Sequence, residues 1–199
     1  MSSELNDTKK RILEAAWHLM EQRRGLEVSM SEIAKAAGIS RQGLYLHFAS
    51  RIELMIATSN YVDEVKGLNE RLKPFLAAAT GIAHIETCVD VWGNYIPEIY
   101  GLAKALMRTR DTDEATAAAW QGSMGCLQDV CRVTIEAIER EGNLASEWSQ
   151  QDAIEMFCTL ISINHWEQLT IEYGWSNEQY ISRMKTLLKQ TFIKKTKIK

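Results

Sequence analysis

Apolar residues recur every three or four positions along most of the chain, and the strict alternation typical of strands is scarce. Three short apolar stripes in the first fifty residues predict three helices; their members are Ile12, Leu13, Ala16, Leu19 and Met20, then Met30, Ile33, Ala34 and Ala37, and then Leu44 and Phe48. Longer helical stripes follow as far as Phe192. The pattern therefore predicts an all-α protein.

The boundaries of the second and third predicted helices are marked by capping residues. Ser29 and Glu32 have the spacing of a capping box, and Ser40 is the expected N-cap of the third helix. Gly38 ends the second helix, so only a three-residue turn separates the two. A turn of this length that contains glycine is typical of a helix-turn-helix.

The third predicted helix has a narrow apolar edge and an unusual outer face. Steps of 100° place Leu44 and Phe48 on one side; the opposite side and its flanks hold Gln42, Gly43, Tyr45, Leu46 and His47. The major groove of B-DNA admits such a helix, where glutamine can bind adenine and an exposed leucine can contact a thymine methyl group. Short helix pairs with a glycine turn also occur in helical proteins that do not bind DNA, so the pattern leaves both possibilities open.

The motifs of this region occur in a family-specific order. The run from "RILEAAWHLM" through "SMSEIAKAAGISRQGLYLHFASRIEL" resembles the DNA-binding domain of the TetR family of transcriptional regulators, notably in "IAKAAGIS", in "LYLHF" and in the Ser-basic-x-x-Leu that follows. The resemblance covers about the first quarter of the chain. It implies a helix-turn-helix DNA-binding domain at residues 1–50, joined through a fourth helix to a larger helical bundle for effector binding and dimerisation at residues 51–199.

The resemblance also implies which residues contact operator DNA. Phosphate contacts are expected from Ser29, Tyr45, His47 and Arg51, and base contacts from Arg41 and Gln42, with Gly43 allowing close approach of the backbone. Leu46 joins the DNA-binding candidates as the exposed leucine of this helix face. Gly43 departs from the Thr, Ser or Ala that the family is expected to have at this position. The base specificity of relatives therefore cannot be transferred to this chain.

Beyond Ile52 the helical stripes are interrupted in five places, near Gly67–Pro74, Thr80–Gly81, Pro97, Asp111 and Gly142–Ser149. Two helices are expected after the last interruption, one capped by Ser149 and continuing to Leu169, the other capped by Ser176 and ending near Phe192. The resemblance implies that these two helices pair with their copies in a homodimer. The alternative is that both stripes face only the chain's own core.

Aromatic and methionine residues in the middle of the chain are candidates for an effector pocket. The residues selected are Trp92, Tyr95, Met107, Trp120 and Met124. Such stripes are usually core, yet a helical bundle rich in these residues can leave an apolar cavity for a ligand. The resemblance implies a small apolar or aromatic inducer, and no cofactor is expected.

Charge is distributed unevenly along the 199 residues, although the net charge is only −3. Lys and Arg number 8 against 7 Asp and Glu in residues 1–60, whereas residues 61–190 hold 11 against 19. This asymmetry is compatible with a DNA-binding amino-terminal part or with a solvated surface. No apolar run approaches the roughly 20 residues of a membrane span, and the amino terminus lacks the apolar segment of a secretory signal, so a cytoplasmic protein with no membrane partner is expected.

The four cysteines, at positions 88, 126, 131 and 158, lack zinc-type pair spacing and are expected to be free thiols. His84 and Cys88 lie four apart on one helical face, which could seat a metal or activate a thiolate, but HExxH, GxSxG and a phosphate-binding glycine loop are all missing. The prediction is a non-enzymatic transcriptional regulator without a metal site, a repressor that a ligand releases from a palindromic operator. A thiol- or metal-responsive sensor and a helical scaffold without DNA remain as alternatives.

Overall fold

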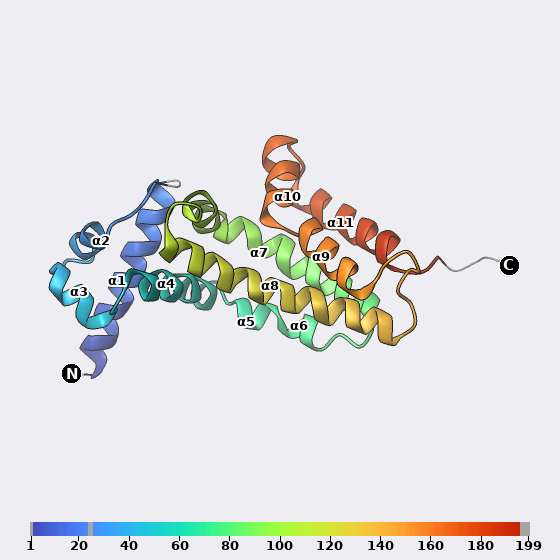
Figure 1. The fold of residues 1–199 in the computed structure, drawn as a ribbon, viewed down its shortest axis with the longest axis horizontal. Coiled ribbons are helices and arrows are strands. Elements are labelled where there is room, and N and C mark those ends of the chain that lie inside the picture. The colour runs from blue at the N-terminus through green and yellow to red at the C-terminus, as the bar shows by residue number, and fades with distance from the viewer. Residues whose placement is uncertain (1, 24–25, 196–199) are drawn as a thin grey trace. The chain divides into compact units, whose positions relative to one another are not determined.

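The computed structural model describes residues 2–23 and 26–195, and these residues are almost entirely helical (Figure 1). The elements in chain order are α1 Ser2–Arg23, α2 Met30–Ala36, α3 Arg41–His47, α4 Arg51–Val65, α5 Leu68–Arg71, α6 Lys73–Leu76, α7 Gly81–Thr109, α8 Glu114–Arg140, α9 Gln150–Leu160, α10 Ile163–Glu167, the π-helix η1 Gln168–Glu172 and α11 Asn177–Phe192. Within the described ranges, β-structure is limited to one isolated bridge between Leu144 and Ile193. The prediction of an all-α fold with an amino-terminal helix-turn-helix is confirmed.

The caps predicted around α2 and α3 are present. The backbone N–H of Glu32 donates to Ser29 Oγ at 3.3 Å, and the N–H of Ser29 donates back to Glu32 Oε2 at 2.9 Å, which completes the capping box. Gly38 follows α2 with φ of +70°, a left-handed conformation that a residue with a Cβ rarely adopts. The N–H of Ile39 then bonds the Ala34 carbonyl at 3.0 Å, which turns the chain into α3.

Contacts divide the chain into two compact units. The first contains the described residues of Met1–Gly67 and Ile99–Met124, and the second those of Leu68–Glu98 and Gly125–Lys199. Both long helices, α7 and α8, run through both units. The division by packing does not follow the predicted boundary at residue 50, because α4 and parts of α7 and α8 pack with the helix-turn-helix. The boundary at residue 50 divides the predicted DNA-binding function from the predicted effector-binding and dimerisation function, and it does not coincide with the division into packed units. It stays a prediction.

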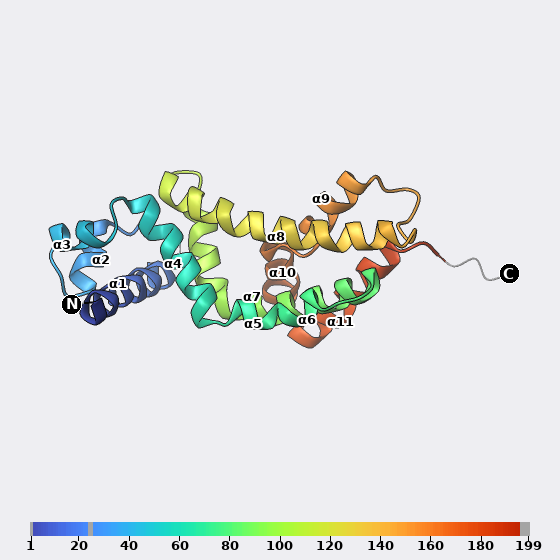
Figure 2. The same ribbon diagram turned by 90° about the horizontal axis from the view of Figure 1, so that it is seen from below.

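The first unit has a continuous apolar core built around α1 and α4. Ile12, Ala16, Leu44, Phe48 and Leu54 are fully buried in it. Helix α1 packs against both α2 and α4, and α2 packs against α3 (Figure 2). The short helix pair α2–α3 is therefore supported by α1. The orientation of α3 is thus determined by the burial of its own apolar edge.

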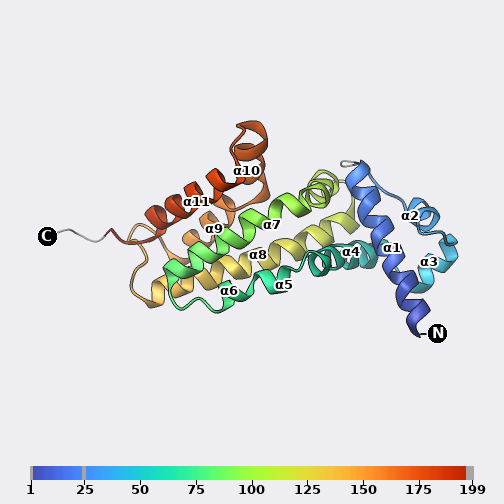
Figure 3. The same cartoon turned by 180° about the vertical axis from the view of Figure 1, so that it is seen from behind.

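The second unit packs α9 and α11 beside the amino-terminal half of α7 and the carboxyl-terminal half of α8 (Figure 3). Helices approach closely at Gly93 in α7, where the Cβ of any other residue would lie 2.5 Å from Ile181 Cγ1. The indole N–H of Trp148 donates to the Thr191 carbonyl at 2.9 Å, and Phe157 and Phe192 are both fully buried. These contacts attach α11 to the bundle.

Helix continuity differs from the prediction in two places. The sequence predicts an interruption at Pro97, yet α7 continues through it. Proline removes only the hydrogen bond to the carbonyl four residues earlier, here that of Gly93, while Ile96 and Leu102 on either side of it are buried in the bundle. The helix expected from Ser149 to Leu169 is instead broken after Leu160, because Ser162 caps a new helix and its Oγ accepts from the His165 N–H at 3.3 Å.

Crossing a bilayer requires a helix that is both long and apolar. Across the described ranges, none of the helices combines the two properties.

Candidate nucleic-acid interface

Helix α3 buries one edge and presents the rest of its surface. Leu44 and the following Phe48 are 0% exposed, whereas Leu46 is 84% and Tyr45 is 41% exposed. The residues selected from the sequence for base contacts or flanking phosphates, Arg41, Gln42, Gly43, Tyr45, Leu46 and His47, are all exposed or half-buried. The structure therefore places these candidates together on the outer surface of one helix.

The start of α3 depends on a close contact between Gly43 and its cap. The Gly43 N–H donates to Ser40 Oγ at 3.0 Å, and a Cβ at Gly43 would lie only 3.2 Å from that oxygen. An alanine would therefore crowd the hydroxyl group that caps the helix. This packing is a local reason for glycine at the position where the family is expected to have Thr, Ser or Ala.

Two cationic side chains, Arg41 and Lys9, lie against aromatic rings at or next to α3. The Arg41 guanidinium lies 5.8 Å from the centre of the Tyr45 ring, and the Lys9 ammonium lies 5.2 Å from the centre of the Phe48 ring. Cation–π contacts of this kind hold a cationic side chain in place without neutralising it. Neither side chain forms an ion pair with another residue of the described part of the chain, so both charges stay available to an anionic partner.

Ser29 is exposed, but its polar groups already have partners. Its hydroxyl donates to Glu32 Oε2 at 2.8 Å, and its backbone N–H donates to the same oxygen. The Ser29 N–H lowers the pKa of Glu32 most, followed by the Ser29 hydroxyl, and Arg23 adds a further ion pair. The predicted phosphate contact of Ser29 would have to compete with this carboxylate.

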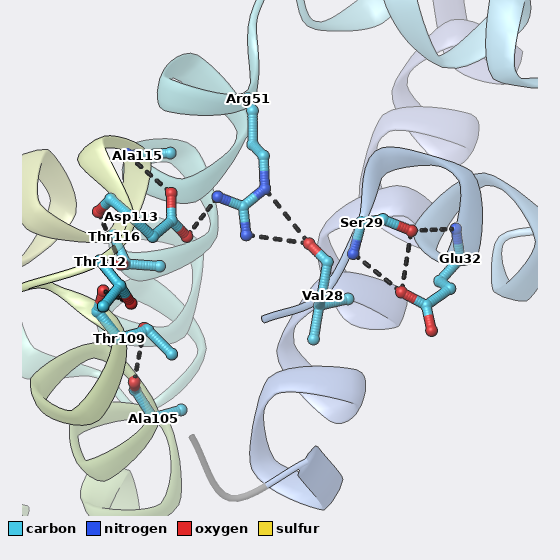
Figure 4. Close-up of polar contacts among 10 residues, drawn as sticks. All are labelled: Val28, Ser29, Glu32, Arg51, Ala105, Thr109, Thr112, Asp113, Ala115 and Thr116. Atoms are coloured by element: carbon cyan, nitrogen blue, oxygen red, sulfur yellow. Dashed lines mark hydrogen bonds and ion pairs between the residues drawn. The ribbon is translucent and has the colours of Figure 1, made fainter. Parts of the chain in front are cut away.

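Arg51 does not project from the helix-turn-helix as the sequence suggested (Figure 4). Its Nη2 and Nε donate to the Val28 carbonyl at 2.9 and 3.2 Å, and its Nη1 forms an ion pair with Asp113. Only 19% of the Arg51 side chain and 9% of the Asp113 side chain are exposed. All three interactions join parts of the first unit, so the guanidinium has a packing role there. The phosphate contact predicted for Arg51 would have to compete with these partners, and it stays a prediction.

Asp113 itself is held at the start of α8. Its Oδ1 accepts from the Ala115 N–H at 3.0 Å, and its carbonyl accepts from the Thr116 hydroxyl at 3.0 Å. Arg51 and Asp113 lie 62 positions apart, so no local pattern in the sequence pairs them. Sequence reasoning therefore missed Asp113.

The five residues selected for an effector pocket fall in different compact units. Trp92 and Tyr95 belong to the second unit, with ring centres 6.0 Å apart, and the Trp92 indole N–H donates to the Ile161 carbonyl at 2.7 Å. Met107, Trp120 and Met124 belong to the first unit and are half-buried. Neither unit on its own brings all five together, and the effector site stays a prediction.

One small cleft lies in the first unit beside Arg51 and Met55. Its other lining residues include Val28, Thr109 and Thr116. The free space corresponds to about one water molecule. The cleft is therefore too small for an organic effector.

His84 and Cys88, the pair considered for metal or thiolate chemistry, are both buried. Burial, followed by the nearby Arg140, lowers the pKa of His84, whose ring packs edge-on against Phe75 at 4.8 Å while its Nδ1 has no hydrogen-bond partner. Burial raises the pKa of the Cys88 thiol to about 12. At neutral pH the pair is thus a neutral imidazole and a protonated thiol, which is unsuited to nucleophilic chemistry.

Residues 12–58 match the family described as bacterial regulatory proteins, tetR family. The match identifies this segment as the amino-terminal domain of that family. The matched residues contain most of α1, all of α2 and α3, and the first half of α4. The family match thus covers the helix-turn-helix and the helices that support it.

One curated relative is similar to about half of the chain. The nucleoid occlusion factor SlmA from Marinomonas sp. (strain MWYL1) is 26% identical over 107 residues, which are 53% of this chain and 53% of that protein. The match thus spans about half the length of this curated relative.

Solved structures resemble the fold of this chain over nearly its full length. FadR from Bacillus subtilis in complex with stearoyl-CoA has a TM-score of 0.71 and 16% identity, covering 92% of this chain and 98% of that one. A regulator from Saccharomonospora viridis in complex with choline also has a TM-score of 0.71, with 16% identity over 96% and 100% of the two chains. At this identity the likeness establishes the fold alone.

Proposed function

We propose that this chain is a transcriptional regulator of the TetR family that reads a palindromic operator through α3. The observation that supports it most is the division of α3 into a buried edge and an exposed face that holds Gln42 and Leu46 beside cationic Arg41. An isolated leucine at 84% exposure contributes nothing to the core of its own unit. In a major groove the same side chain would contact a thymine methyl group.

The exposed residues of α3 divide into base-reading and phosphate-binding groups. Arg41 and Gln42 would hydrogen-bond to base edges, and a bidentate contact of this kind contributes about 1–3 kcal/mol of discrimination. Tyr45 and His47 lie toward the flanks, where their polar ends would bind phosphates. Arg51 is left out of this set because Val28 and Asp113 already occupy its guanidinium.

A homodimer through α9 and α11 would present two such helices to successive major grooves. Both helices carry exposed apolar side chains, Met156 at 39% in α9 and Leu187 at 40% in α11. Two-fold symmetry requires half-sites about 34 Å apart, and it doubles the number of bases that one regulator reads. This arrangement would account for the palindromic operator.

We further propose repression that a small apolar or aromatic ligand relieves. Two solved structures with a similar fold hold small molecules, stearoyl-CoA in one and choline in the other. Trp92 and Tyr95 in one unit, and Met107, Trp120 and Met124 in the other, are the residues we expect to change environment on binding. The ligand would favour a spacing of the two α3 helices that no longer matches the operator, which is a shift between two populations.

DNA binding can be tested by fluorescence anisotropy. The purified chain would be titrated into labelled DNA flanking its own gene and into an unrelated duplex, each at several salt concentrations. We expect tight binding to one duplex that weakens steeply with salt, because phosphate contacts release counterions. Gln42→Ala should weaken specific binding by roughly 5- to 150-fold, the equivalent of about 1–3 kcal/mol.

A matched control is Gln128→Ala, which removes an exposed glutamine side chain from α8, away from the helix-turn-helix in the sequence. It should bind DNA like the unaltered chain. Equal effects of the two substitutions, or wild-type affinity in Gln42→Ala, would contradict the assignment of α3 as the reading helix. If no genomic sequence selected by the chain binds it better than random DNA, the regulator proposal itself fails.

A further inference from the structure

One guanidinium joins three separate segments of the first unit. Arg51 is the first residue of α4, Val28 lies in the non-helical segment 26–29 before α2, and Asp113 directly precedes α8. Arg51 Nη2 and Nε donate to the Val28 carbonyl at 2.9 and 3.2 Å, and Nη1 pairs with Asp113 Oδ2 (Figure 4). Because a guanidinium is planar and rigid, the carboxylate on one edge determines where the donors on the other edge point.

The Asp113 carboxylate is held by α8 itself. Its Oδ1 accepts from the Ala115 N–H at 3.0 Å, which leaves Oδ2 for Arg51. The Asp113 carbonyl accepts from the Ala117 N–H at 2.9 Å and from the Thr116 hydroxyl at 3.0 Å. The acceptor that orients the guanidinium therefore moves with the first turn of α8.

Val28 connects the guanidinium to the helix-turn-helix. It is only 2% exposed and belongs to the core of the first unit. The next residue, Ser29, is the N-cap of α2, and its carbonyl accepts from the Ile33 N–H at 3.1 Å. Helix α2 in turn packs against α3. Because residues 26–29 form no helix, contacts with other segments determine where α2 begins, and Arg51 supplies two of those contacts.

The ion pair is sheltered from water. Only 9% of the Asp113 side chain and 19% of the Arg51 side chain are exposed. The cleft beside Arg51 and Val28 has room for about one water molecule. Solvent screens partly buried charges much less than exposed ones. Loss of the charge on Asp113 would therefore release the guanidinium, since the solvent at this position cannot replace the carboxylate.

We propose that Asp113 is a positioning residue for DNA binding, which holds the Arg51 guanidinium on the Val28 carbonyl and thereby fixes the start of α2 and the orientation of α3. Asp113 contacts no DNA in this arrangement; it acts through Arg51 and Val28. The turn between α7 and α8 thus regulates the affinity of α3 for its operator. This inference rests on the proposed function, because it names a residue that controls the same interface.

The substitution Asp113→Asn removes the charge and keeps the cap. An asparagine oxygen can still accept from the Ala115 N–H, and asparagine is as good an N-cap as aspartate. Its other polar atom is an amide nitrogen, which donates as the guanidinium does and so cannot hold it. If α2 and α3 then keep the competent orientation about a tenth of the time, operator affinity falls about tenfold. Fluorescence anisotropy measures this loss, at a temperature where circular dichroism shows the variant to be folded.

The direction of the change separates positioning from simple electrostatics. Removing a negative charge by itself strengthens DNA binding, and an Arg51 released to a phosphate would also make the salt dependence steeper by about one unit of slope. The proposal predicts weaker binding with an unchanged slope, and tighter binding or a steeper slope overturns it. Arg51→Lys keeps the charge but lacks the fork of donors, so it should lose affinity as Asp113→Asn does, and the double variant should lose no more than either.

Hydrogen–deuterium exchange supplies a readout that needs no DNA. The amides of Ser29 and Glu32, bonded within the capping box, should exchange faster in Asp113→Asn than in the unaltered chain, whereas the amides of α11 should exchange equally. The matched control Asp129→Asn removes one negative charge from α8 at an exposed pair with Arg132, and it should change neither exchange nor affinity. Unchanged exchange in Asp113→Asn overturns the inference. If the unaltered chain selects no DNA, the proposed function fails, and the exchange difference still decides whether Asp113 positions α2.

Discussion

The ion pair between Arg51 and Asp113 allows the loss of stability on replacing Arg51 to be estimated from the structure. Replacing Arg51 with methionine keeps an aliphatic side chain but removes two hydrogen bonds to the Val28 carbonyl, at 2.9 and 3.2 Å. It also leaves the Asp113 carboxylate, whose side chain is only 9% exposed, without its cation. Because Arg51, Val28 and Asp113 all belong to the first unit, the free energy of unfolding of that unit should fall.

The expected loss follows from the number and burial of these contacts. Each hydrogen bond to Val28 contributes about 1 kcal/mol. Removing one member of a fully buried ion pair costs about 3–5 kcal/mol, and water screens this pair partly because 19% of the Arg51 side chain is exposed. We expect Arg51→Met to lower the free energy of unfolding by about 3 kcal/mol in total.

A double-mutant cycle separates the pair from its surroundings. Asp113→Ala removes the same ion pair and, in addition, the N-cap bond to the Ala115 N–H, which contributes about 1 kcal/mol. Because both single variants lose the ion pair, the double variant should be more stable than additivity predicts by about 1–2 kcal/mol. The free energies come from equilibrium urea unfolding, followed by both tryptophan fluorescence and circular dichroism.

Two results would refute this reasoning. The first is additivity of the two substitutions within about 0.5 kcal/mol, which would mean that the residues do not interact in solution. The second is a stable Arg51→Met variant that binds operator DNA with a reduced salt dependence, since that is the behaviour of a lost phosphate contact. Arg132→Met is the matched control; it breaks an exposed pair with Asp129 and should leave the unfolding midpoint unchanged.

Three further predictions concern single sites. Burial lowers the pKa of His84 below its ordinary value of 6.5, so its contribution to stability is complete above pH 6.5 and is lost as the pH falls; unfolding measured from pH 8 to pH 5 should show less acid loss in His84→Gln. Ser40→Ala removes the cap of α3 and should cost about 1 kcal/mol in urea unfolding, and an unchanged midpoint would show that the cap is dispensable. Exposed Cys126 should react with a thiol reagent at pH 8 in the folded chain, whereas Cys88, with a pKa raised to about 12, should react only after unfolding; equal rates would contradict its burial.

Features that depend on neighbouring residues could be predicted from the sequence. The Ser29–Glu32 capping box, the stop at Gly38 and the cap at Ser40 all form between residues at most five positions apart. The division of α3 between buried Leu44 and exposed Leu46 follows from helical spacing alone. The helix-turn-helix was accordingly predicted with its boundaries, and its family motifs extended the prediction to a regulator.

Features that depend on distant residues were missed or misplaced. Helical spacing could not reveal that Arg51 forms an ion pair with Asp113, because the two residues lie 62 positions apart in separate segments of the chain. The break after Leu160 was also missed, since the apolar stripe continues across it while Ser162 supplies a new cap. In the same way, the stripe of Trp92 and the stripe of Trp120 gave no sign that they belong to separate compact units.

The sequence by itself determined the helical class, the caps of α2 and α3 and the face that α3 presents, because these depend on residues within one or two turns of each other. Only the tertiary structure decided that the Arg51 guanidinium contacts Val28 and Asp113 within its own unit. Such contacts depend on how helices pack, and packing is determined by the shape and burial of many side chains together. An arginine looks the same in the sequence whether its guanidinium faces solvent or binds an aspartate 62 positions away.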